Sequence, residues 1–234
     1  MTRHVRAAWP DPRPFVARGG RPIRILALSD ESDRALDHQR NRDALEPLDG
    51  LVGCGDLDAE YLAFVADAFP GARLIYVRGN HDRGHRWGLA ARRLPEPLAS
   101  GHRDRLAGLS VMGLEWPGIA RRNRTHDERG AWREVIRAAL GDRARALAGR
   151  SEPILVVSHV APAGLGDLPN DPYHRGFRGY RWLADRARPP LWIHGHTPVA
   201  EVGALSIAAG PTLVLNATGS VLVEVVGPEH RSPM

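Results

Sequence analysis

Several short apolar segments of this chain end at side chains that can bind a metal ion. Residues 73–77 have the composition of a buried strand, and the turn Gly79-Asn80-His81-Asp82 begins two residues later. Other segments of this kind are followed by Asp30, by Asp56, by His159, and by the pair His194 and His196. The carboxyl ends of parallel strands meet at one edge of a sheet. We therefore expect these side chains to lie together at the edge of a sheet in an α/β fold.

Strand-like and helical segments alternate along the chain. Apolar residues at helical spacing predict helices over residues 59–69 and 127–148. Buried strands are predicted over residues 23–29, 51–54, 73–77, 106–114, 153–158 and 190–193. The β-branched runs 204–208, 212–215 and 221–226 favour antiparallel hairpins in a second sheet. We expect one domain over residues 21–230, preceded by a Pro/Gly-rich lead-in over residues 1–20.

The composition excludes a membrane-spanning chain, because no apolar run approaches the roughly 20 residues that a bilayer requires, and no membrane partner is expected. The single cysteine, Cys54, lies within a strand pattern, which predicts a buried, inert thiol and a cytoplasmic protein. The net charge is +5, and all 32 basic residues are arginine. These arginines are scattered among acids except for short clusters such as residues 121–124. Nucleic acid is therefore the less favoured partner, while an anionic substrate such as a phosphate ester fits the charge.

The predicted edge combines carboxylate, amide and imidazole groups. This donor set suits divalent Mn, Fe, Co, Ni or Zn, and two such ions about 4 Å apart can clamp a phosphate and activate water. Taken singly, each residue has a simpler reading. Asp30 fits a helix N-cap, Asp56 a turn residue and His159 a structural histidine. Jointly, their positions at successive strand ends favour the metal site.

In order and spacing, these residues resemble the calcineurin-like metallophosphoesterases over residues 23–216. The resemblance implies an α/β sandwich with two mixed sheets flanked by helices, and two divalent ions held by the loops. It implies Asp56 as the ligand that bridges both ions. Asp30 and His196 would hold the first ion, and Asn80, His159 and His194 the second.

The reaction implied by the resemblance is hydrolysis of a phosphate ester by a metal-bound hydroxide. His81 would act near the leaving group, and Asp82 would orient its ring. The ester is a phosphodiester or a phosphomonoester of a small or nucleotide-like molecule. The alternative is a non-catalytic scaffold or binding protein on the same fold, and a third reading, favoured by the arginines, is a nuclease.

One departure from the family pattern lies at Ser32. The family usually has Asp-x-His after its first strand, whereas this chain has Asp30-Glu31-Ser32, as in a bacterial subgroup. Glu31 or Asp33 could replace the missing imidazole, which would favour Mn or Mg, with Mn the expected ion. A water molecule could fill the position, or the site could bind a single ion.

Arginine and histidine side chains near the predicted edge are candidates for binding the substrate phosphate. A guanidinium can bind a phosphate through two parallel hydrogen bonds. His174 and Arg175 lie between the segments that carry His159 and His194, and Arg78 directly precedes the Gly-Asn-His-Asp turn. Surface charges in a loop are the alternative interpretation for all three.

Overall fold

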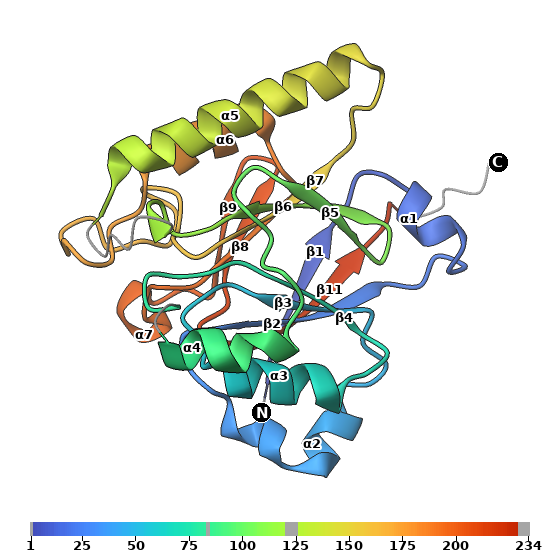
Figure 1. The fold of residues 1–234 in the computed structure, drawn as a ribbon. Coiled ribbons are helices and arrows are strands. Elements are labelled where there is room, and N and C mark those ends of the chain that lie inside the picture. Colours follow the sequence, from blue (N-terminus) through green and yellow to red (C-terminus); the bar gives the residue numbers. More distant parts are fainter. Residues whose placement is uncertain (1, 83–84, 120–125, 229–234) are drawn as a thin grey trace.

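The computed structural model describes residues 2–82, 85–119 and 126–228. It has two mixed β-sheets packed face to face, with helices on both outer faces (Figure 1). The five-stranded sheet has the order β1-β11-β2-β3-β4 and the six-stranded sheet the order β5-β6-β7-β8-β10-β9. This architecture confirms the predicted fold class. No helix in the described ranges is long and apolar enough to cross a membrane.

The first sheet consists of β1 (Arg3–Ala8), β2 (Ile23–Ser29), β3 (Gly50–Gly53), β4 (Arg73–Tyr76) and β11 (Gly219–Val226). The second sheet consists of β5 (Arg103–Leu106), β6 (Leu109–Leu114), β7 (Ile154–Ser158), β8 (Leu191–His194), β9 (Ser206–Ala209) and β10 (Thr212–Asn216). The longer helices are α3 (Ala59–Ala68), α5 (Glu128–Leu147) and α6 (Arg178–Ala187). The shorter helical elements are α1 (Arg13–Val16), η1 (Arg34–Asp37), α2 (Gln39–Asp43), α4 (His85–Ala90), η2 (Ala91–Arg93) and α7 (Val199–Val202).

Most strands are continuous apolar runs in the sequence, because each sheet is packed against the other sheet on one face and against helices on the other face. In β7, Leu155 and Val157 belong to the core between the two sheets. Ile154 and Val156 pack on the opposite face, in the core beneath α5 and α6. A third core lies beneath α3, where Leu62 and Val65 contact the outer face of the five-stranded sheet. The result is four layers, helix, sheet, sheet and helix.

Two predicted segments divide differently in the structure. Residues 106–114 do not form a single strand, because Ala107 and Gly108 adopt positive φ angles of 49° and 90° and turn β5 back into β6. In the tail, β9 and β10 pair antiparallel as predicted. β11 instead crosses to the first sheet, where it lies antiparallel to β2. Since both sheets contribute to one core, an apolar run of β11's kind fits either of them.

The prediction of a lead-in over residues 1–20 was wrong. Residues 3–8 form β1, which pairs in parallel with β11 at the edge of the five-stranded sheet. Its alternating charged residues hid the strand, because an edge strand exposes them, and His4 reaches Glu224 of β11 at 3.2 Å. Trp9 and Phe15, which follow β1, are buried in the core between the sheets.

Removal of residues 1–20 is therefore expected to destabilise the domain strongly. The truncation deletes one strand and exposes the surfaces that Trp9 and Phe15 cover, and the loss of one large aromatic core side chain alone costs about 3 kcal/mol or more. Urea unfolding of a chain that begins at Arg21 measures the change, with a chain that begins at Arg3 as the control. Equal unfolding midpoints for the two chains would show that β1 is dispensable.

Candidate metal centre

The loops that follow β2, β3, β4, β7 and β8 meet where the carboxyl ends of the two sheets come together. They bring together Asp30, Asp56, His159 and His196, whose ligand atoms all lie within 4.8 Å of one another. β2, β3 and β4 pair in parallel, as do β7 and β8, so each pair of neighbours ends at the same edge. The predicted convergence of strand ends is thus present in the structure, with both sheets contributing.

Three residues of this cluster adopt left-handed backbone conformations. The φ angles are 59° at Asp30, 53° at Asp56 and 68° at His196. For residues other than glycine this region costs roughly 1–2 kcal/mol each, and such outliers gather at functional sites. The loops therefore turn sharply straight after their strands, which places the side chains at the edge rather than along the strand direction.

His159 carries the clearest sign of a cation site. Its Nδ1 lies 2.8 Å from the Cys54 carbonyl oxygen, which can only accept, so Nδ1 carries the proton. Its Nε2 then faces Asn80 Oδ1 at 2.9 Å and Asp56 Oδ2 at 3.2 Å. Two oxygen acceptors around one ring nitrogen are satisfied either by a proton on Nε2 or by a cation that lies between the three groups. Burial lowers the pKa of His159, but the neighbouring Asp56 carboxylate more than offsets this. Without a bound cation, the pKa of His159 is raised to about 9.

His196 presents its other nitrogen to the cluster. Its Nε2 lies 2.7 Å from the Tyr173 carbonyl oxygen and must donate to it, which leaves the Nδ1 lone pair free. Its backbone N–H donates to Asp30 Oδ2 at 2.7 Å. Burial, with His159 nearby, lowers the pKa of His196 to about 3. The ring is therefore neutral, the form that binds metal ions.

His194 lies apart from this four-residue cluster. It is fully buried at the end of β8, and its Nδ1 lies 2.9 Å from the Gly195 carbonyl oxygen. Its Nε2 faces Gly166, where a Cβ would come within 2.9 Å. Burial lowers the pKa of His194 to about 4, so this ring is also neutral and has a free Nε2 lone pair.

Asp82 and His81 are separated in the structure. Asp82 is buried, and its Oδ2 accepts from the backbone N–H groups of Asp56 at 2.7 Å and Gly79 at 2.8 Å. Asp82 therefore fixes two loops to each other, and the structure does not show the predicted orientation of the His81 ring. The His81 side chain is 64% exposed, with Nε2 4.0 Å from Asp56 Oδ2. Its backbone N–H donates to Asp56 Oδ1 at 2.7 Å.

Glycines allow the loops to approach closely. A Cβ on Gly79 would overlap the Asp56 carboxylate, and one on Gly195 would overlap Ser29 Oγ and lie 2.5 Å from Asp30 Oδ2. Ser29 Oγ donates to the Gly55 carbonyl oxygen at 3.0 Å, so this contact holds the first two loops together. The positions of Asp30 and Asp56 depend on these small residues.

The substitution Gly195→Ala is expected to displace Asp30 and to weaken metal binding at least tenfold. The added methyl group would overlap the buried Ser29 side chain and press on Asp30 Oδ2, and overpacking of this kind costs about 1–3 kcal/mol of folding free energy. Manganese titration and thermal unfolding measure both effects. Gly141→Ala is the matched control, because nothing lies within 4 Å of its Cβ position. Wild-type metal affinity in Gly195→Ala would contradict the geometry described above.

The candidate replacements for the missing imidazole lie outside the four-residue cluster. Both carboxylate oxygens of Asp33 already form hydrogen bonds. Its Oδ1 accepts from Ala35 N–H at 2.9 Å, and its Oδ2 accepts from the Ser220 hydroxyl. Glu31 and Ser32 are exposed and line a cavity of about 430 Å³ beside Asp33. Of the two carboxylates, Glu31 is the one that is free to turn toward the cluster.

The predicted substrate-binding residues have different surroundings. The His174 ring centre lies 5.2 Å from that of His196, and its Nδ1 is 2.5 Å from Asp171 Oδ2. Arg175 is exposed and lines a separate cavity of about 480 Å³. Arg78 forms an ion pair with buried Glu115, with Nε 2.6 Å from Oε1. The arginine cluster at residues 121–124 lies outside the described residues.

Sequence reasoning missed two residues at this centre. The buried Trp116 ring lies 6.1 Å from His159 and 5.5 Å from His196, so an aromatic ring packs against both imidazoles. Trp116 follows β6 by two residues, so it too lies just after the end of a strand, which was the available signal. Tyr173, whose carbonyl fixes His196, acts through its backbone and leaves no trace in the residue pattern.

Two packed mixed sheets with a carboxylate and histidine cluster at their common edge define a metal-site α/β sandwich. The family model for calcineurin-like phosphoesterases matches residues 43–200. The chain belongs to this family, whose members bind two divalent ions and usually hydrolyse phosphoesters. The family resemblance predicted from the motifs is thereby confirmed.

Solved structures resemble this chain at low sequence identity. The protein TT1561 of Thermus thermophilus has the same fold and is 14% identical, with a TM-score of 0.54 over 85% of this chain and 90% of that one. A dimetal phosphatase from Danio rerio is 11% identical, with a TM-score of 0.49 over 85% of this chain and 88% of the other. A search of curated protein sequences finds no match to this chain.

Proposed function

We propose that this protein hydrolyses a phosphate ester with divalent metal ions held between Asp30, Asp56, His159 and His196. The observation that carries the proposal is the arrangement at His159, whose Nε2 faces the oxygens of Asp56 and Asn80. A divalent ion satisfies all three groups at once, and the donor set suits manganese. Family membership supports the same reaction class.

Each ligand has a proposed place. Asp56, whose carboxylate lies within 4.8 Å of the other three ligand atoms, would bridge two ions, and Asn80 and His159 would hold one of them. Asp30 and His196, joined by the 2.7 Å hydrogen bond, would hold the other ion. His194 is proposed beside Asn80 and His159, and because it lies outside the four-residue cluster, His194→Ala is the variant that tests its assignment. Glu31 would complete the Asp30 side in place of the absent imidazole.

The chain's own residues would position the ester and move its proton. Metal ions, when bound, neutralise phosphate charge and activate water. Exposed His81 lies above the Asp56 carboxylate and can give a proton to the departing alkoxide. His174, whose ring centre lies 5.2 Å from that of His196, can contact the phosphoryl group. Asp82 holds the loops of Asp56 and Gly79 together by accepting hydrogen bonds from both backbone N–H groups.

The proposed activity is tested with two chromogenic esters, bis(4-nitrophenyl) phosphate and 4-nitrophenyl phosphate. Protein stripped by a chelator and reloaded with manganese is expected to release nitrophenol from at least one of them, and the faster one shows whether diesters or monoesters are preferred. The stripped protein is the control and should be inactive. Equal rates with and without metal would contradict a metal-dependent reaction.

The second candidate is a non-catalytic protein on the same fold. The observation that favours it is Ser32, an exposed hydroxyl where the family places a metal-binding imidazole. It predicts that manganese binds at most weakly and that neither ester is hydrolysed with any divalent ion. The same assay therefore separates the two candidates.

A further inference from the structure

Helix α5 has an unusual outward face. At 20 residues it is the longest described helix, and it lies along the outside of the molecule (Figure 1). Ala131, Val135 and Ala138 point inward, into the core that α5 shares with α6 and the six-stranded sheet. On the other side three large apolar side chains face solvent: Ile136 is 48% exposed, Leu140 63% and Leu147 82%. Apolar side chains this exposed on one helix face mark a contact surface.

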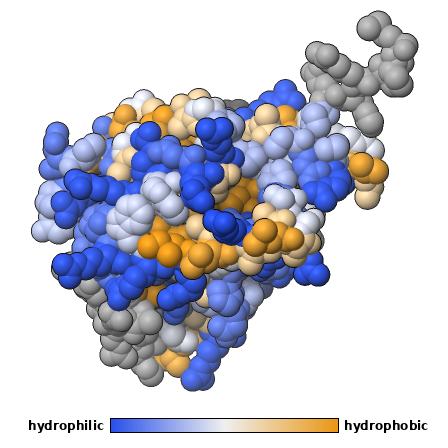
Figure 2. Space-filling model, turned by 90° about the horizontal axis from the view of Figure 1, so that it is seen from above, coloured by the Kyte–Doolittle hydropathy of each residue, from blue (hydrophilic) through white to orange (hydrophobic). Residues whose placement is uncertain are grey.

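Arginines share this face with the apolar residues. At 3.6 residues per turn, the outward arc contains Arg129, Arg133, Ile136, Arg137, Leu140, Arg143, Ala144 and Leu147. We call these eight residues the α5 outer face. Figure 2 looks onto this side and shows a hydrophobic band bordered by hydrophilic residues. The face contains no acidic residue.

The acidic residues of α5 are all engaged elsewhere. Glu128 accepts from the backbone N–H groups of Arg178 and Gly179, at the start of α6. Glu134 accepts from Ser100 Oγ at 3.0 Å. Asp142 is paired with Arg103. Of the arginines on the face, only Arg133 has an ion pair within the described ranges, a 3.7 Å contact with Asp127. The outer face is therefore positive as well as apolar.

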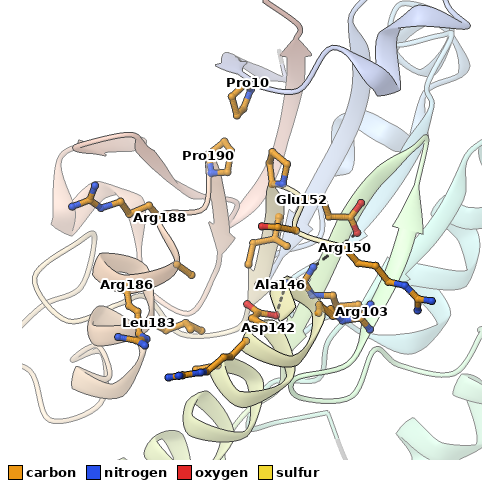
Figure 3. A pocket seen from close by; sticks show the side chains of 17 residues that line it. Pro10, Arg103, Asp142, Ala146, Arg150, Glu152, Leu183, Arg186, Arg188 and Pro190 are labelled. Carbon is orange, nitrogen blue, oxygen red and sulfur yellow. Dashed lines mark hydrogen bonds and ion pairs between the residues drawn. The ribbon is translucent and has the colours of Figure 1, made fainter. Parts of the chain in front are cut away.

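The positive surface continues past the end of the helix. A cavity of about 650 Å³ opens beside the last turns of α5, and Arg143 lines it as well as belonging to the outer face. Arg145, Arg150, Arg186 and Arg188 line the same cavity without an ion pair among the described residues, and Figure 3 shows Arg150, Arg186 and Arg188 around it. Its carboxylates, Asp142 and Glu152, are both paired with arginines.

The combination of apolar and positively charged side chains indicates which kind of partner the α5 outer face binds. A second copy of the chain would bring its own arginines against these and be repelled. A nucleic acid would be bound by the guanidiniums and would leave the exposed leucines and isoleucine unused. An anionic bilayer uses both, because aliphatic side chains enter the headgroup boundary while arginines pair with lipid phosphates.

We propose that the α5 outer face binds the surface of an anionic phospholipid bilayer. The proposal is independent of the proposed hydrolase activity. It departs from the expectation of no membrane partner, which rested on the lack of a spanning segment. Binding in the plane of the interface requires no such segment, only an exposed amphipathic helix with basic residues.

The test is co-sedimentation of the full chain with phosphatidylcholine vesicles that contain or lack phosphatidylglycerol. Binding is expected only to the vesicles with phosphatidylglycerol and should weaken with added salt. Arg137→Gln with Arg143→Gln should reduce the affinity about 30-fold, since each basic residue near such a surface contributes about 1 kcal/mol. Ile136→Gln with Leu140→Gln should reduce it about tenfold or more.

The matched control is Arg40→Gln with Arg92→Gln, two exposed arginines that have no ion pair among the described residues and lie far from α5 in sequence. This variant should bind vesicles as the wild type does. All variants should keep the wild-type unfolding midpoint, because none of the four outer-face side chains is buried. Absence of vesicle binding, or equal losses in the control and Arg137/Arg143 variants, overturns the proposal. Binding to duplex DNA but not to vesicles overturns it in favour of nucleic acid.

Discussion

Replacement of Asp56 by asparagine is expected to empty the metal centre and to reduce turnover at least 1,000-fold. The carboxylate has Oδ2 3.2 Å from His159 Nε2, accepts from His81 N–H through Oδ1, and lies within 4.8 Å of the ligand atoms of Asp30 and His196. An amide of the same shape has no charge and offers one oxygen instead of two. It cannot bridge two cations or balance their charge. The metal content of purified protein, measured by elemental analysis after dialysis, should fall from two ions per chain to near zero.

Asp58→Asn is the matched control for this experiment. Asp58 lies two residues further along and caps α3, where Oδ1 accepts from Glu60 N–H at 2.8 Å. Asparagine also caps helices well, so metal content, turnover and stability should all stay near wild type. An Asp56→Asn protein that retains two tightly bound ions would exclude Asp56 as the bridging ligand, whatever its turnover.

Replacement of His81 by alanine is expected to separate metal binding from catalysis. The ring is largely exposed, and the residue's contact with Asp56 Oδ1 is made by its backbone N–H, which alanine retains. Metal content should therefore stay unchanged, while turnover falls about 100- to 1,000-fold, as for the loss of a general acid. The loss should be larger for phenyl esters than for nitrophenyl esters, because a poorer leaving group needs the proton more.

His102→Ala provides the comparison for the His81 variant. His102 is exposed near β5, and its hydrogen bonds in the described structure come from its backbone groups. Its replacement should change neither metal content nor turnover. Loss of bound metal in His81→Ala would instead make His81 a ligand, and an equal loss for both kinds of ester would argue against a proton donor.

The strand ends were predictable because parallel strands buried on both faces leave continuous apolar runs in the sequence. Polar residues such as Asp30, Asp56 and His159 then stand out where each run stops. β1 did not show this signal, since its charged residues are exposed at a sheet edge and pair with Glu224. The choice of sheet for β11 was also hidden, because an apolar run fits a strand of either sheet and does not say which strand is its neighbour.

Within the site, residue type predicted the cluster better than it predicted individual contacts. Asp82 and His81 are adjacent in sequence but face different surroundings, one buried beneath the loops and the other exposed above them. His194 and His196 likewise diverge, because the left-handed backbone at His196 turns the chain between them. Such differences follow from φ angles and from close approaches at Gly79 and Gly195, which residue identity alone does not determine.

The most direct test of the central claim is a manganese titration of the metal-free wild-type protein, with bound metal and ester hydrolysis measured on the same samples. We expect two ions per chain at saturation, with hydrolysis that rises as the sites fill and disappears when a chelator removes the ions. A protein that binds no manganese and hydrolyses neither ester with any divalent ion would contradict the account and leave the fold as a scaffold.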